Sequence, residues 1–160
     1  MSVSEAHSPE ALALFNPAIT SVALTFAVES YSEENSEGFP FYCSFLVMPL
    51  TLNPQLRASV TQSRRKTLAS WCVSNPTLHA QFPQIARILV PTTRHAVRHS
   101  LRCELLEMRN GILYVRRRPK RVRRSHSQEL RAVVAGARTC GKWFAATDVT
   151  TAFSLLGVRP

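Results

Sequence analysis

The dipeptide Asn110-Gly111 leaves the chain around it few ways to fold. Both residues readily adopt the positive φ angles that a two-residue β-hairpin turn requires. The residues after it, "ILYV", favour a strand, and the segment from Pro91 to about Leu106 has helical spacing. The predicted core face of that helix comprises Val90, Val97, Leu101, Leu105 and Met108.

A helix followed by a hairpin, after further helices and a short strand, is the element order of a winged helix-turn-helix. We therefore predict a mainly α fold, namely a winged-helix-like helical domain with a small β-hairpin and a C-terminal helical pair. The predicted parts are a flexible N-terminal tail (1–15), the winged-helix-like domain (16–115), a basic linker (116–125) and a helical pair packed on the same domain (126–160).

The N-terminal half contains the other predicted elements of that domain. Asn16 and Pro17 suit the N-cap and the first position of a helix that ends in "SEENSEG". The apolar stripe of this helix comprises Ala18, Val22, Phe26 and Tyr31, widened by Leu24 and Val28. The run "FPFYCSFLVMPL" fits a strand or a buried helix, and its length favours a strand.

Two more helices are predicted in the middle of the chain. One runs from Thr61 to Val73. The next follows Asn75-Pro76, with Pro83 in its first turn or at a break.

Capping residues mark the C-terminal helical pair. Ser125 and Gln128 resemble a capping box at the start of the first helix. Thr147 or Asp148 suits the N-cap of a final short helix, and Gly157 its C-terminal stop.

The charge of the chain is large and unevenly placed. A net charge of +10 and a pI of about 10.5 favour a polyanionic partner, either nucleic acid or an acidic protein surface. The first Lys or Arg is Arg57, whereas six glutamates precede it. This acidic head could attract the basic body within one fold, or each could face a different partner, as would suit an adaptor.

Three groups of cations are the predicted contacts to DNA phosphates, most of them in the run "RRRPKRVRR". They comprise Arg64, Arg65 and Lys66; Arg98 and Arg102 beside Arg94; and Arg116, Arg117, Arg118, Lys120, Arg121, Arg123 and Arg124. Such contacts give affinity that does not depend on sequence, and double-stranded DNA is the expected nucleic acid. The alternative is a solvated linker whose charges repel one another.

No catalytic constellation can be assembled from the sequence, so the chain is predicted not to be an enzyme and to need no cofactor. Asp148 is the sole aspartate and sits in a capping context, and Glu104, Glu107 and Glu129 suit helix surfaces. The five glycines are too scattered for a phosphate-binding loop.

His95, His99 and Cys103 share one face of a predicted helix, but no metal site is predicted there. The outer two are eight residues apart, about 12 Å at the helical rise, which is too far for one small ion. Cys103 lies beside basic residues that could activate a thiol, yet no carboxylate is placed to orient a base.

Cysteine spacing and hydropathy place the chain in the cytoplasm. The four cysteines form no CxxC pair, which favours reduced, buried thiols. The N-terminus lacks the cationic start of a signal peptide. The apolar stretch 11–30 contains too many polar residues for a membrane span.

The C-terminal sequence "GKWFAATDVTTAFSLLGVRP" resembles the closing signature of the middle component of bacterial three-component ABC systems, which typically reads "GRWF", a gap and "LLGVRP". Similar segments occur in the same order upstream: "NPA", "FPFYCSFLVMPLTL", "SWCVSNPTLHAQFPQIARILVPTTRHAV" and "LLEMRNGILYV". The resemblance covers nearly the whole chain from Asn16. The chain departs from the pattern at "AATDVTT", and the arginine run is not part of the signature.

The resemblance implies a small non-catalytic subunit that bridges an SMC/Rad50-like ABC ATPase and an effector protein, a nuclease or other toxic effector. Such systems, Lamassu among them, defend bacteria against phages and plasmids. Arg94 and Arg159 are the predicted partner interface, because matched surface cations are hard to explain by packing. The matched structural signature comprises Trp71, Asn75, Pro76, Phe82, Pro91, Trp143, Phe144, Leu156 and Gly157. The second hypothesis is a free-standing winged-helix DNA-binding regulator, and the third is a small nuclease or other enzyme.

Overall fold

The computed structural model describes residues 15–123 and 126–160. The predicted tail up to Leu14, the phosphate contact Arg124 and the cap Ser125 lie outside these residues. Within the described part, a three-stranded antiparallel sheet has the order β1 (Phe39–Pro40), β3 (Ile112–Val115), β2 (Leu106–Arg109). The helices of that part are α2 (Pro17–Glu34), the 3-10 turn η2 (Phe41–Cys43), α3 (Ser44–Leu52), α4 (Pro54–Gln62), α5 (Leu68–Ser74), α6 (Pro76–Ile88), α7 (Val90–Arg102), α8 (Gln128–Ala145) and α9 (Val149–Leu155).

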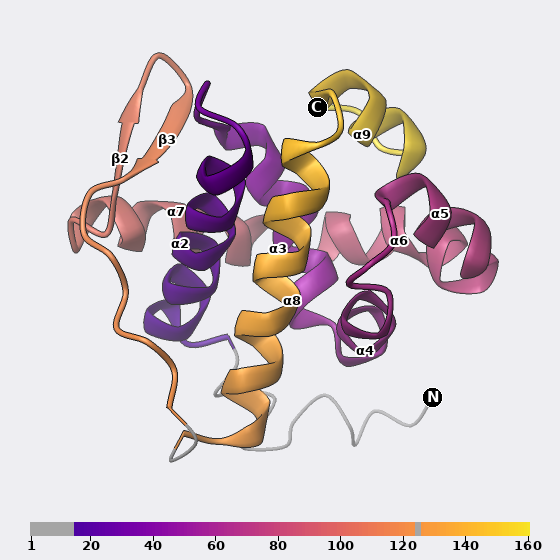
Figure 1. The fold of residues 1–160 in the computed structure, drawn as a ribbon, viewed down its shortest axis with the longest axis horizontal. Coiled ribbons are helices and arrows are strands. Elements are labelled where there is room, and N and C mark those ends of the chain that lie inside the picture. Colours follow the sequence, from indigo (N-terminus) through magenta and orange to yellow (C-terminus); the bar gives the residue numbers. More distant parts are fainter. Residues whose placement is uncertain (1–14, 124–125) are drawn as a thin grey trace.

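The fold is mainly helical with a small sheet and two C-terminal helices, as the sequence predicted (Figure 1). Helix α7 directly precedes the hairpin β2–β3, and β1 joins that hairpin as a third strand. The likeness to winged-helix domains stays a prediction. None of the helices in the described residues combines the length and apolar character of a membrane span.

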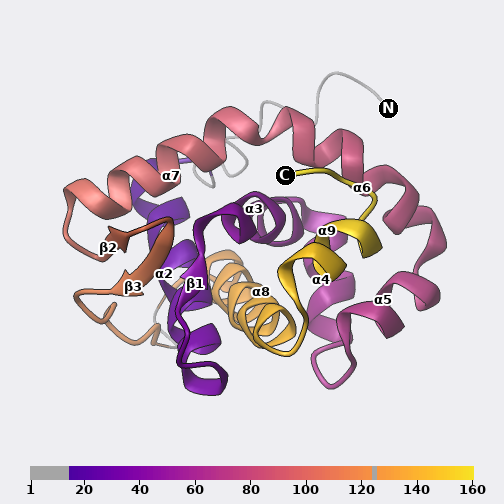
Figure 2. The ribbon, with the colours of Figure 1, turned by 90° about the horizontal axis from the view of Figure 1, so that it is seen from above.

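Helix α2 is the centre of the core. Later elements surround it, since α8, α7, α3 and β3 all contact it (Figures 1 and 2). The helix is therefore buried on most sides from Thr20 to Val28. The predicted apolar stripe is wrong at Ala18, which is exposed. A helix in a central position needs no polar face, and the buried hydroxyls of Thr20, Ser21 and Thr25 donate to carbonyls of the same helix.

Helices α2 and α8 lie side by side and cross closely at Gly141 (Figure 1). A Cβ atom at this glycine would lie 2.3 Å from the backbone oxygen of Ala27 and 3.0 Å from Ser30 Cβ. The absence of a side chain at Gly141 is therefore what permits this helix–helix distance.

The hairpin prediction is confirmed. Asn110 and Gly111 have φ angles of 51° and 75°, as a type I′ turn requires, and Met108 pairs with Leu113 across the strands. The helix before the hairpin is shorter than predicted, because Glu104 adopts a φ of 57° and ends it at Arg102. Leu106 consequently enters the core, whereas Met108 is exposed.

The preference for a strand in "FPFYCSFLVMPL" is wrong. Only Phe39 and Pro40 form a strand, and the run continues as η2 and the buried helix α3. Pro49 is accommodated within α3. A helix buried on all sides has no amphipathic period, so the sequence pattern could not separate it from a strand.

The single helix predicted from Thr61 to Val73 is also wrong. Helix α4 ends at Gln62, and Thr67 caps a new helix by accepting a hydrogen bond from the Ser70 N–H at 3.2 Å. Pro83 lies in the middle of α6, beyond its first turn, and the helix continues past it.

The other cap predictions are largely confirmed. Asn16 accepts from the Ala18 N–H at 2.9 Å, and Asp148 accepts from the Thr151 N–H at 3.0 Å. Ser127 caps α8, accepting from the Leu130 N–H, two residues after the predicted Ser125.

Arg57, the first cation of the chain, is a core residue with a side chain 6% exposed. Its guanidinium donates to Thr51 O at 2.9 Å and to Leu52 O at 3.2 Å, and it pairs with Glu129 of α8. Burial lowers the pKa of Arg57, and the charge of Glu129 opposes that shift. Arg57 thus satisfies the last carbonyls of α3 and joins α4 to α8.

Candidate functional site

The residues of the C-terminal signature form a turn that brings the last described residues back against the helices. Gly157 has a φ of 68°, and the Val158 N–H donates to Phe153 O at 3.1 Å, which closes a Schellman motif. His79 Nε2 donates to Leu155 O at 2.5 Å, so α6 holds the end of α9. Val158 to Pro160 are thereby directed along α6.

The matched aromatic residues support this arrangement from within the core. Trp71 and Trp143 pack with ring centroids 6.1 Å apart, and Trp71 Nε1 donates to Ser59 Oγ at 3.0 Å. Phe82, Phe144 and Leu156 are fully buried as well. Asn75 Nδ2 donates to Trp71 O at 3.0 Å at the junction of α5 and α6, where Pro76 begins α6. These positions serve packing and turns.

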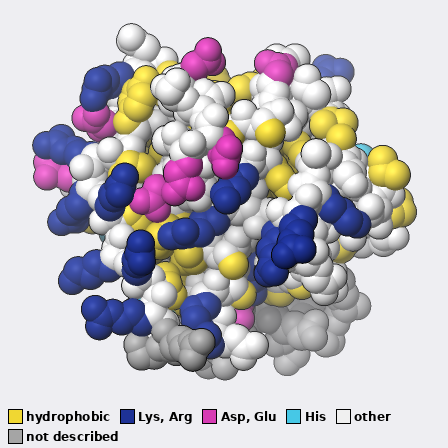
Figure 3. All heavy atoms as spheres, in the orientation of Figure 1, with side chains coloured by type: hydrophobic (Ala, Val, Ile, Leu, Met, Phe, Trp, Pro, Cys, Tyr) yellow, Lys and Arg dark blue, Asp and Glu magenta, His cyan; other side chains and the backbone are white. Residues whose placement is uncertain are grey.

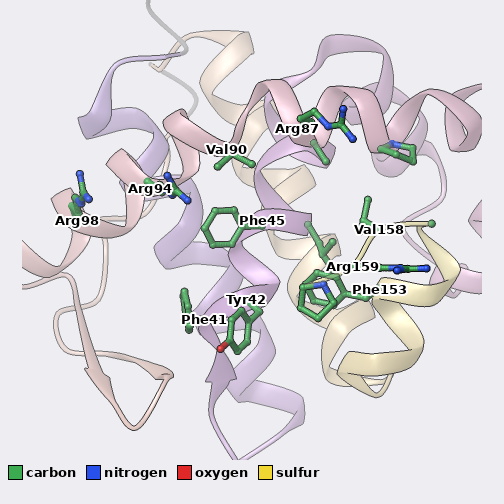
Figure 4. Close-up of a pocket in the computed structure, with 15 residues that line it drawn as sticks. Phe41, Tyr42, Phe45, Arg87, Val90, Arg94, Arg98, Phe153, Val158 and Arg159 are labelled. Carbon is green, nitrogen blue, oxygen red and sulfur yellow. The ribbon is translucent and has the colours of Figure 1, made fainter.

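A groove of about 870 Å³ opens between η2–α3, α6, α7 and the C-terminal segment (Figure 4). Its apolar lining includes Phe41, Tyr42, Phe45, Phe153 and Val158. The rings of Phe41 and Tyr42 pack 4.2 Å apart between centroids, and Tyr42 is 48% exposed. We call this feature the arginine groove, because four arginines also line it.

Those arginines are Arg94 and Arg98 of α7, Arg87 of α6 and Arg159 of the C-terminal segment. Figure 4 shows the α7 pair on one side of the aromatic rings and Arg87 with Arg159 on the other. No carboxylate side chain lines the groove, and within residues 15–123 and 126–160 none of the four forms an ion pair with Asp or Glu. The two predicted interface cations, Arg94 and Arg159, therefore share one site.

Sequence reasoning missed the aromatic part of this groove. Phe41, Tyr42 and Phe45 belong to the run that fits a strand or a buried helix, and only the exposure of Tyr42 in the structure distinguishes this residue. Arg87 lies in the segment "SWCVSNPTLHAQFPQIARILVPTTRHAV" that resembles the family pattern, but it was not predicted as an interface residue. The sequence feature that could have indicated a role for Arg87 is its position seven residues before Arg94.

The first three arginines of the basic linker contact other parts of the fold. Arg116 lies 3.4 Å from Glu104, Arg117 donates to Cys103 O at 2.9 Å, and Arg118 lies 3.7 Å from Glu29. Glu29 of the acidic head therefore pairs within the same chain. At least one partner of each ion pair is more than half exposed, so each of the two ion pairs contributes less than about 1 kcal/mol.

Two arginines of α8 extend this basic surface, and sequence reasoning missed both. Arg138 lies 3.9 Å from Glu29 and 4.8 Å from the centre of the Phe26 ring, and Arg131 lines the same shallow pocket as Arg121. Their spacing of seven residues on a helix would have placed them on one face. Figure 3 shows Lys and Arg over this side of the molecule, beside the carboxylates.

The predicted phosphate contacts lie in separate places. Lys120, Arg121 and Arg123 are exposed in the linker, whereas Arg64, Arg65 and Lys66 form the turn between α4 and α5. The linker and that turn are on opposite sides of the view in Figure 1. Arg98 borders the arginine groove, and Arg102 is exposed at the end of α7.

His99 and Cys103 are brought together, and His99 also contacts Ser21. His99 Nδ1 lies 3.0 Å from Ser21 Oγ, and Cys103 Sγ lies 3.6 Å from His99 Nε2. Residues 15–123 and 126–160 contain no group of three or more metal-ligating side chains.

Burial raises the pKa of the Cys43 thiol to about 12, so that thiol stays protonated near neutral pH.

The fold and the site define a small helical protein with a basic, aromatic surface groove suited to binding. The chain belongs to the family described as ABC-three component (ABC-3C) system Middle Component 3, whose model matches residues 4–160. Comparisons with curated proteins and with solved structures gave no match. As a middle component of an ABC three-component system, the chain is an accessory subunit that works with ABC ATPase components.

Proposed function

We propose that this protein is a non-catalytic adaptor that bridges the ABC ATPase and an effector of a defence complex in the cytoplasm. The observation that carries the proposal is the convergence of Arg94 and Arg159 on the arginine groove. They come from distant parts of the family pattern, and the groove exposes aromatic and cationic groups that are enriched at protein interfaces.

The adaptor role predicts that the tagged full-length chain co-purifies with the ATPase and the effector encoded beside it. The double variant Arg94→Glu/Arg159→Glu should lower recovery of at least one partner tenfold or more, because reversed charges repel an acidic surface. Quantitative pull-down after nuclease treatment measures this. The control Arg64→Glu/Arg65→Glu makes the same charge change on the α4–α5 turn and should recover both partners normally. If the wild-type chain is recovered under these conditions without either partner, the adaptor role is refuted.

Contact with the DNA backbone is the second part of the proposal. Lys120, Arg121 and Arg123 are its strongest candidates, because they are exposed and form no ion pair within the described part of the chain. The other proposed contacts are Arg64, Arg65, Lys66, Arg98, Arg102 and the remaining cations of the 116–124 run. Contacts of this kind bind phosphates without reading bases.

Replacing Lys120, Arg121 and Arg123 with serine should weaken DNA association of the complex and flatten its dependence on salt. Each lost phosphate contact reduces the log–log salt slope by about 0.9, so the full effect is roughly 2 to 3. Anisotropy titrations with duplex DNA at several salt concentrations measure the slope. The triple variant Arg116→Ser/Arg117→Ser/Arg118→Ser should change it less, because these arginines have intramolecular partners. Equal slopes for wild type and the first variant, or misfolding of that variant, would contradict the assignment.

A free-standing DNA-binding regulator is the second candidate function. It is favoured by the exposure of Arg98 and Arg102 on α7, the helix directly before the hairpin. This function requires sequence-selective binding by the isolated chain, and wholly non-selective binding that moderate salt abolishes would exclude it.

A further inference from the structure

The arginine groove carries a concentrated positive charge that no carboxylate side chain among residues 15–123 and 126–160 neutralises. Arg87, Arg94, Arg98 and Arg159 line it, and its lining contains no Asp or Glu. The glutamate pairs of the described residues lie elsewhere, at the linker, the hairpin, the α4–α8 contact and the α2–α8 contact. Four guanidiniums around one depression, without a carboxylate side chain beside them in the described part of the chain, favour an anionic occupant.

The floor of the groove adds an apolar requirement. Phe41 packs against Tyr42 and, edge-on at 6.3 Å, against Phe45, so the three rings form a platform at the base of the groove. Nearly half of the Tyr42 surface is exposed. An inorganic or purely phosphate ligand would leave this platform in water, whereas an apolar side chain would cover it and gain about 25 cal/mol per Å² buried.

The arrangement of charges around the platform limits the occupant further. Arg94 and Arg98 lie one helical turn apart on one side, and Arg87 and Arg159 lie on the other, with the rings between them (Figure 4). Carboxylates on both sides of an apolar side chain would match this order. The volume of about 870 Å³ suits a few side chains of an extended or helical segment, not a folded domain.

Building on the adaptor function proposed above, we infer that the arginine groove binds a short acidic segment of a partner protein. The segment has one or two aromatic or branched aliphatic anchors flanked on both sides by Asp or Glu. The anchors rest on Phe41, Tyr42 and Phe45, and the flanking carboxylates bind the arginines, with which they can form paired hydrogen bonds. Single-stranded nucleic acid, which also binds arginines and aromatic rings, is less favoured, because the planes of Phe41 and Tyr42 are tilted by 37° and those of Phe41 and Phe45 by 75°, so the platform offers no row of parallel faces for successive bases to stack on.

Fluorescein-labelled 15-residue peptides that tile the ATPase and effector encoded beside this chain provide the probe. In anisotropy titrations with the full-length protein, the peptides that bind should be acidic and contain such an anchor. Their affinity should fall about tenfold or more for Arg94→Ser, for Arg159→Ser and for Tyr42→Ser. The control Lys142→Ser, which removes an exposed cation of α8 outside the groove, should bind them like the wild type.

Three outcomes would overturn the inference. The first is that none of the tiling peptides binds, and the second is that the peptides that bind are neutral or basic. The third is that labelled oligo(dT) of 15 nucleotides binds the wild type more tightly than every peptide and binds the groove variants less tightly than the wild type. Co-purification of the wild-type chain with its partners in parallel separates the two proposals. If the wild-type chain co-purifies with its partners but no acidic peptide binds, the adaptor function is retained and only the proposed acidic segment is excluded.

Discussion

Replacing Gly141 with alanine is expected to lower the free energy of unfolding by about 3 kcal/mol. The new Cβ would lie 2.3 Å from the Ala27 carbonyl oxygen, and that atom belongs to the backbone of α2. A flexible side chain could move aside, but here α2 and α8 must separate, which loosens the packing around α2. Urea unfolding followed by circular dichroism measures the change.

The matched control lies one and a half turns earlier in α8. A Cβ on Gly136 would lie 3.4 Å from Arg57 Cγ and 3.7 Å from Thr51 Cγ2, which are ordinary contacts with side chains. Gly136→Ala should therefore keep the stability or raise it by up to about 1 kcal/mol, because alanine favours the helix. Equal destabilisation by both substitutions would show that the close approach at Gly141 is not what sets the α2–α8 distance.

Replacing Arg57 with leucine is expected to cost about 3 kcal/mol, although leucine is apolar and the site is buried. The change leaves the carbonyls of Thr51 and Leu52 without their donor and removes the partner of Glu129. Chemical unfolding again provides the measurement.

Glu129→Gln tests the origin of that cost. The Glu129 side chain is 46% exposed, so water replaces much of the lost ion pair and the cost should be about 1 kcal/mol or less. A Gln variant as unstable as the Leu variant would mean that the ion pair, rather than the capping of α3, stabilises this corner.

Local signals in the sequence were sufficient to predict the elements whose geometry depends on a few neighbouring residues. The positive φ angles at Asn110 and Gly111 and the caps at Asn16 and Asp148 follow from backbone chemistry that those residues carry with them. Helix α3 could not be predicted in this way, because burial on every side removes the periodicity that identifies a helix.

The candidate site was predictable only in part, for a related reason. Arg94 and Arg159 came from matched positions, but their meeting in one groove depends on the turn at Gly157 and on the packing of α9 against α5 and α6. The platform residue Tyr42 has the same sequence surroundings as the buried Cys43. The partners of Arg118 and Arg138 depend equally on tertiary structure, since Glu29 lies far from both in the chain.

The central position of α2 has a consequence for folding during translation. This helix leaves the ribosome first among the described elements, yet α8, which covers much of it, is synthesised near the end. Until then the apolar surface of α2 has no permanent cover, and completing the core requires contacts across most of the chain. We therefore expect folding to finish only after nearly the whole chain has been translated, with nascent chains that stop before α8 depending on chaperones.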